Sequence, residues 1–246
     1  MTRYFTPIFL LLFISCSVLS AQEEQISGTE LLNRSISFHD PSGQWQKVKM
    51  ELVIDQEMPN GSVRPSHVII DNQKGAFELS FVKDNHLFNW KVDGRDSTES
   101  FMDYRVITDS VRVDTLQLSP DRARRWRNYY SYLYGLPMKL MDKGTNIDPV
   151  VQSTTFDGKP VLALKVTYDK NVGSDTWYFY FHPETYALAG YRFFHNEAEN
   201  DGEYIVIEGL EIQNGMRIPM HRAWYTNNEN RWLGTDRFIS LKLTRN

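Results

Sequence analysis

The sequence predicts a mainly β (α+β) fold: an antiparallel, half-open β-barrel of about ten strands with two helices, one of which covers the concave side. Apolar and polar residues alternate over long stretches, beginning at residues 48–54, as in strands with one solvated face. Asp157-Gly158 and Asn214-Gly215 separate such stretches, and these dipeptides are strong hairpin signals. Because strand follows strand with few helices between them, we expect a meander that closes or half-closes into a barrel.

The N-terminal residues 1–21 have the pattern of a signal peptide. Arg3 gives a positive start, residues 5–18 are mostly apolar, and Ser20-Ala21 offers small residues for cleavage. The run is too short for a permanent membrane span, so we expect an exported, periplasmic protein whose residues 22–246 form a single β domain. The alternative is a lipoprotein anchored to the membrane through Cys16, but apolar residues continue beyond that cysteine.

The first predicted helix begins after Ser27, which forms a capping box with Glu30, and runs to about Phe38. The segment 39–43 ends it, because the residue before Pro41 avoids the helical region. Strands are expected from residue 48 onward. The stretch 96–118 is the hardest to interpret, and its alternation favours short strands at residues 105–108 and 110–115.

The second predicted helix is marked at both ends. Ser119 is placed as its N-cap with Pro120 in the first position, and Gly135 is placed just beyond its end. Helical spacing puts a run of apolar residues on one stripe of this helix: Ala123, Trp126, Tyr130 and Leu133, widened by Tyr129.

Four arginines crowd the first turns of that helix, where the helix dipole disfavours cations: Arg122, Arg124, Arg125 and Arg127. They are therefore expected to have anionic partners. One interpretation is salt bridges to surface carboxylates. The other is a phosphate or carboxylate headgroup held beside the apolar stripe, which would make an amphiphile site.

The most aromatic stretch, residues 176–195, reads as a hairpin with a turn around Pro183. In its first strand, Trp177, Phe179 and Phe181 share one face, and Tyr178 and Tyr180 share the other. Most such aromatics form core, but a barrel of about ten strands also has room for a ligand.

The chain carries none of the common catalytic or cofactor motifs, so we expect neither an enzyme nor a cofactor. His195, Glu197 and Glu199 alternate but are too few and too exposed for a metal site. His39-Asp40 is better explained by the end of a helix than by catalysis. The net charge of −4 argues against nucleic acid as a partner.

Five strings carry a family resemblance: residues 38–45 (FHDPSGQW), 134–140 (YGLPMKL), 175–181 (DTWYFYF), 191–195 (YRFFH) and 233–236 (LGTD). The chain resembles a family of uncharacterised exported proteins common in Bacteroidetes, within the wider superfamily of LolA/LolB-like lipoprotein carriers. The superfamily resemblance implies an unclosed β half-barrel, helices that lid an apolar cavity, and transport of acyl chains across the periplasm.

These observations favour a non-catalytic periplasmic or envelope protein that binds a lipid, an acyl chain or another amphiphile. Six residues are expected to line the cavity, from the helix Trp126, Tyr130 and Leu133 and from the sheet Trp177, Phe179 and Phe181. Arg122 and Arg125 are expected at the headgroup. The alternative is an envelope protein-interaction module whose core is filled by its own side chains and which binds no ligand.

Overall fold

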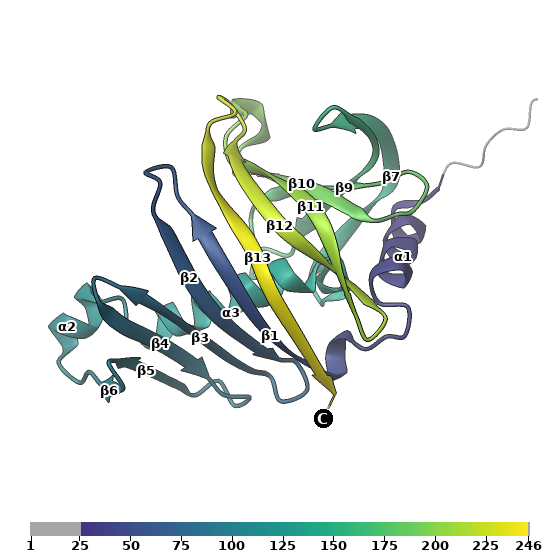
Figure 1. Cartoon of the computed structure of the whole chain (residues 1–246). Coiled ribbons are helices and arrows are strands. Elements are labelled where there is room, and N and C mark those ends of the chain that lie inside the picture. The colour runs from purple at the N-terminus through teal and green to yellow at the C-terminus, as the bar shows by residue number, and fades with distance from the viewer. Residues whose placement is uncertain (1–25, 246) are drawn as a thin grey trace, which may run out of the picture.

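The computed structural model describes residues 26–245, so the predicted signal segment 1–21 and Cys16 lie outside the described residues. In this described part of the chain, a single antiparallel sheet of thirteen strands curls into an open half-barrel (Figure 1). The predicted fold class is confirmed, with thirteen strands in place of about ten.

The sheet consists of two meanders joined edge to edge. The first contains β1 (Val48–Glu57), β2 (Val63–Asp71), β3 (Ala76–Lys83), β4 (His86–Val92), β5 (Thr98–Met102) and β6 (Arg105–Val106). The second contains β7 (Thr145–Phe156), β8 (Lys159–Tyr168), β9 (Thr176–Phe181), β10 (Leu188–Phe194), β11 (Glu203–Gln213), β12 (Met216–Thr226) and β13 (Trp232–Arg245). Pairing of β1 with β13 joins them, so the sheet has its edges at β6 and β7.

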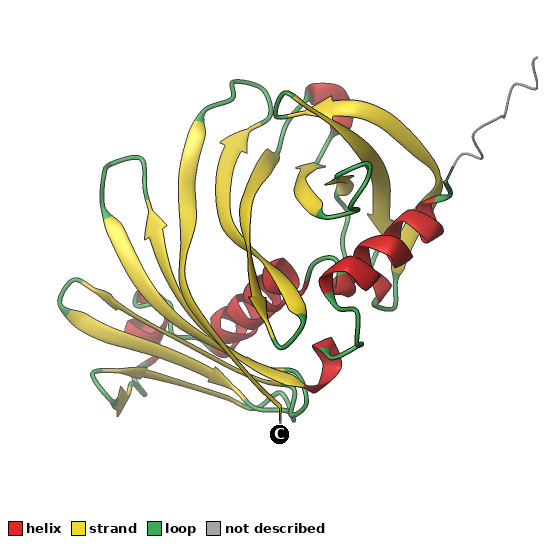
Figure 2. Cartoon of the chain, turned by 45° about the vertical axis from the view of Figure 1, so that its right-hand side comes forward, coloured by secondary structure: helices red, strands yellow, loops and turns green. Residues whose placement is uncertain are grey.

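Within residues 26–245, three α-helices accompany the sheet: α1 (Gly28–His39), α2 (Ser110–Thr115) and α3 (Pro120–Gly135). Helix α3 lies across the concave side and packs on β2 to β5, whereas α1 packs against β7 and β12 at the other end of the half-barrel (Figure 2). Short 3-10 turns occur at Trp45–Lys47, Met138–Met141 and Glu197–Glu199. No helix within residues 26–245 is long and apolar enough to cross a membrane.

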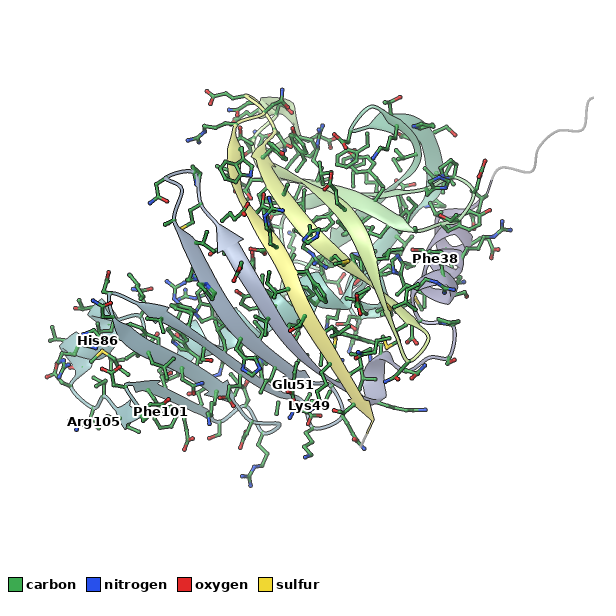
Figure 3. The ribbon with its side chains drawn as sticks, in the orientation of Figure 1. Phe38, Lys49, Glu51, His86, Phe101 and Arg105 are labelled. Atoms are coloured by element: carbon green, nitrogen blue, oxygen red, sulfur yellow. The ribbon has the colours of Figure 1, made fainter. Side chains whose placement is uncertain are left out.

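Strand alternation separates the inner face from the outer one. In β1 the even-numbered residues from Val48 to Ile54 are buried. Lys49 and Glu51 lie on the opposite face, where their side chains form an ion pair of 3.2 Å (Figure 3). The convex face of β1 is therefore solvated, and the apolar interior lies beneath α3.

Both long helices begin where the sequence predicts. The Ser27 hydroxyl accepts the Glu30 amide at 3.2 Å, and the Ser119 hydroxyl accepts the Arg122 amide at 3.3 Å. The Glu30 side chain pairs with Arg34 and does not return to the cap.

Two local predictions are wrong. Residues 110–115 form helix α2 and not a strand, because the Asp109 side chain caps the Arg112 amide at 2.8 Å. Gly135 is the last residue of α3 and not the residue beyond it. A side chain at Gly135 would collide with the ring of Trp45, so this glycine allows a close approach and does not turn the chain.

Candidate functional site: a groove beside helix α3

A groove of about 950 Å³ runs along α3, between residues 70–76 at the β2–β3 turn and the strands β8 to β12. Its apolar wall comes from both the helix and the sheet: Ile70, Tyr129, Tyr132, Leu133, Trp177, Phe193 and Trp224. Its rim is polar and includes Asp71, Arg127, Lys139, Asp142, Lys143, Asp175, His195 and Glu203. The site is thus a long apolar floor between charged edges.

The floor is built from aromatic side chains that oppose each other across neighbouring strands. Trp177 on β9 pairs with Phe193 on β10, and their ring centroids are 4.8 Å apart. Tyr132 meets Trp177 at 5.6 Å from the helix side, and Tyr129 stacks on Trp224 at 6.2 Å. Since these rings are only partly buried, they present faces that a ligand can contact.

A hydrogen bond of 2.5 Å between the hydroxyls of Tyr132 and Tyr168 fixes the helix side of the groove to the end of β8. Burial raises the pKa of Tyr168 to about 12 and that of Tyr132 well above its usual value. Both phenols therefore stay protonated in the physiological range, and one donates to the other.

Two buried ionisable side chains, Arg222 on β12 and Asp236 on β13, lie close to α3 and to Trp224. Arg222 is fully buried and donates to the carbonyl of Leu133 at 3.0 Å, while its guanidinium lies 4.1 Å from the ring centre of Tyr134. Asp236 opposes it in the β12–β13 ladder and is hydrogen-bonded by the side chain of Trp224. Burial raises the pKa of Asp236. These contacts hold α3 and Trp224 in position.

The rim carries both signs of charge. Asp175 lies 2.9 Å from His195, and this carboxylate raises the pKa of the imidazole. Burial raises the pKa of Glu203. Lys139 contacts Asp142 on the opposite edge, beside Lys143.

The eight residues expected to bind a ligand fall into three groups. Leu133 and Trp177 line the groove. Phe179 and Phe181 are fully buried farther along the same face of β9 and do not line the groove. Trp126 and Tyr130 pack on the other side of α3, where Trp126 meets Phe81 and Trp90 at about 6.4 and 6.3 Å.

The remaining two, Arg122 and Arg125, lie on the first turns of α3 outside the groove lining. Arg122 donates to Gln117 and lies 5.7 Å from the Trp126 ring, while Arg125 is exposed. Their neighbours Arg124 and Arg127 each form a 2.7 Å ion pair with Asp96 in the β4–β5 turn. Asp96 thus supplies the expected surface carboxylate for these two arginines.

His39 and Asp40 have structural contacts. The Nδ1–H of His39 donates to the Arg217 carbonyl at 2.6 Å, and its Nε2 accepts the Leu188 amide at 3.0 Å. Burial lowers the His39 pKa to about 4, which keeps the ring neutral. Asp40 accepts two backbone amides at 2.8 Å each. The pair joins α1 to the sheet.

The alternating residues at 195–199 separate in the structure. The Tyr178 hydroxyl donates to Glu197 at 2.6 Å, and Lys165 pairs with the same carboxylate at 3.2 Å, whereas His195 turns to Asp175. Across residues 26–245, no three His, Cys, Asp or Glu side chains are grouped so that they could hold a metal ion.

Most residues of the groove were not among the predicted ligand residues, and those that matter most for its shape are Tyr132, Phe193, Glu203 and Trp224. Phe193 could have been found, since it lies two positions from Tyr191 in the aromatic hairpin and shares its face. Tyr132, Glu203 and Trp224 join the site only through the curl of the sheet and the position of α3.

The profile of DUF6503, a family of unknown function, matches residues 7–240. No curated protein matches the chain. Among solved structures, a LolA superfamily protein from Nitrosomonas europaea is similar at 10% identity, with 90% of this chain and 95% of that chain covered and a TM-score of 0.54. This likeness shows a LolA-like fold.

Two other solved structures have lower scores. A Vibrio parahaemolyticus domain described as an outer membrane lipoprotein-sorting protein has 10% identity, coverage of 87% and 92%, and a TM-score of 0.49. A DUF1329 family protein from Desulfovibrio piger has 12% identity, coverage of 89% and 93%, and a TM-score of 0.47.

Proposed function

We propose that this chain, which belongs to the DUF6503 family of unknown function, is a non-catalytic binding protein for a lipid or another amphiphile in the cell envelope. The observation that carries this proposal is the groove of about 950 Å³ with its aromatic floor. Its volume lies near the upper end of the range for small-molecule sites, about 300–1,000 Å³.

The groove suits an acyl chain on physical grounds. Each methylene moved from water onto an apolar surface contributes about 0.8 kcal/mol, so a chain of ten carbons that covers the floor has ample driving force. The charged residues of the rim could bind a polar headgroup at the edge of the same groove. An amphiphile would match both features.

In this proposal Leu133 and Trp177 contact the ligand, together with Phe193 and Trp224. Phe179 and Phe181 support Trp177 from buried positions on the same face of β9. The likeness in fold to a LolA superfamily protein supports a binding role. The envelope location rests on the signal-like residues 1–21, with an anchor at Cys16 as the alternative.

The test is native mass spectrometry with lipid extraction on the protein expressed from its full chain and recovered from a Gram-negative envelope. We expect a co-purifying amphiphile that is lost by about tenfold or more in Trp177→Ala. Tyr178→Ala is the matched control, because Tyr178 is the next residue on β9 and faces the other side of the sheet.

Two results would contradict the proposal. One is a protein free of lipid that also binds no added fatty acid. The other is equal loss of the amphiphile in Trp177→Ala and Tyr178→Ala. The first would favour the alternative, an interaction module without a ligand.

A further inference from the structure

Glu203 stands at one end of a row of aromatic side chains on the inner face of the sheet. Trp177 on β9 opposes Phe193 on β10, and Phe193 opposes Glu203 on β11. Directly opposed residues have Cβ atoms about 4.5–5.5 Å apart, so the carboxylate lies beside the Phe193 ring. All three side chains line the groove.

The Glu203 carboxyl is half-buried, and within residues 26–245 no side-chain hydrogen bond or ion pair satisfies it. The two neighbouring carboxylates, Asp175 and Asp201, already have hydrogen-bond partners. Asp175 pairs with His195, and one Asp201 oxygen accepts the amides of His195 and Asn196 at 2.9 and 2.8 Å. Glu203 is thus the carboxyl at this end of the groove that is left for a ligand.

Aromatic faces next to a carboxylate form a site for an organic cation. The face of an aromatic ring attracts a nearby ammonium group, and the attraction grows as water is excluded. A carboxylate at the edge of the same rings adds a charge-assisted hydrogen bond. A protonated His195 would repel an ammonium group bound beside Glu203. The Asp175 carboxylate, which pairs with His195, offsets that positive charge.

We propose that Glu203, with Phe193 and Trp177, binds the ammonium group of an amphiphile whose chain lies along the groove. This inference rests on the proposed function and adds the class of headgroup. Phosphoethanolamine-type lipids have the required chemistry, because their ammonium stands a few bonds from the chain-bearing end. A soluble amine without a chain offers the same ammonium group from another source.

The test compares two lysophospholipids of equal chain length, below the concentration at which they form micelles. Lysophosphatidylethanolamine carries an ammonium group, and lysophosphatidylglycerol does not. Calorimetric titration of the full-length protein is expected to give about tenfold tighter binding of the ethanolamine lipid. Glu203→Gln should remove this preference and leave the glycerol lipid's affinity unchanged.

Glu208→Gln is the matched control, since Glu208 lies on the same strand, is exposed and lines a different surface. It should keep the tenfold preference. Chain-free phosphoethanolamine identifies the source: if it binds as tightly as the lysolipid and loses affinity in Glu203→Gln, the ammonium site stands but its ligand is a soluble amine.

Other outcomes overturn the inference. Equal binding of the two lysolipids by the unmodified protein would contradict the ammonium site and leave the proposed function intact. A preference that survives Glu203→Gln would place the headgroup elsewhere. If neither lysolipid bound, the proposed function would fail as well.

Discussion

Aromatic side chains lie on both sides of α3, but they fill the core on one side and line an open groove on the other. Where α3 packs on β3 and β4, Phe81, Trp90 and Trp126 fill the space between helix and sheet, and Phe81 and Trp90 lie 4.9 Å apart. On the β9 to β12 side, rings such as Trp177 and Phe193 lie just as close, at 4.8 Å, yet they line an open groove. Aromatic density alone therefore does not identify a binding surface.

The position of the helix makes the difference. Helix α3 packs directly on β2 to β5, so side chains from both elements interdigitate there. Toward β8 to β12 it is held at a few points, chiefly the Tyr132–Tyr168 hydrogen bond and the bond from Arg222 to the Leu133 carbonyl. The space between those contacts is the groove.

The largest expected effect separates core from groove. Trp90 is 2% exposed and its indole donates to the Gln117 carbonyl at 2.9 Å, so Trp90→Ala should lower the free energy of unfolding by about 3–5 kcal/mol. Trp177→Ala should cost about 1–2 kcal/mol because the ring is only partly buried. Urea unfolding of both variants checks this, and equal losses would erase the distinction between the two sides.

The next prediction concerns His39, which joins α1 to the sheet. His39 has a folded pKa of about 4, below the value near 6.5 of an unfolded histidine, so its contribution is complete above pH 6.5 and is lost as pH falls from 6.5 to 4. The loss should reach about 3 kcal/mol. Unfolding measured across this range should show a weaker pH dependence in His39→Gln; an unchanged dependence would place the titration elsewhere.

A smaller effect is expected from filling the groove. Ser131 lies on α3 in the groove lining and is half-buried, so Ser131→Trp should reduce fatty-acid affinity by about tenfold with little change in stability. Arg125→Trp adds the same side chain on an exposed position of the same helix and should bind normally. Fluorescence titration measures both, and normal binding by Ser131→Trp would move the ligand out of the groove.

The smallest expected effect is at Asp96. Its ion pairs with Arg124 and Arg127 are exposed, and exposed pairs contribute little to stability. Asp96→Asn should therefore leave the urea midpoint of unfolding unchanged. A clear shift would mean that the arginine-rich end of α3 depends on this pairing.

Much of the fold could be predicted because its signals are local. The Ser27 and Ser119 caps and the turns at Asp157-Gly158 and Asn214-Gly215 are all present in the structure. The same local reasoning failed at residues 110–115, where Val111 and Val113 alternate as in a strand although no residue of this short helix is buried. Alternation of apolar and polar residues does not identify a strand where those residues pack against no core.

The site could be predicted less well because it depends on contacts far apart in sequence. Alternation correctly placed Trp177, Phe179 and Phe181 on one face. It could not tell that Phe179 and Phe181 are fully buried farther along the strand while Trp177 borders open space. That distinction is set by where α3 crosses the sheet, some fifty residues earlier in the chain.

The central claim is that a ligand occupies one side of α3 and not the other. Photolabelling with a diazirine fatty acid, followed by peptide mass spectrometry, tests it most directly. Labels are expected on Trp177, Phe193 and Trp224, in amounts reduced by excess unlabelled fatty acid. Labels confined to β3 to β5, or to outer-face residues such as Tyr178, would contradict the account.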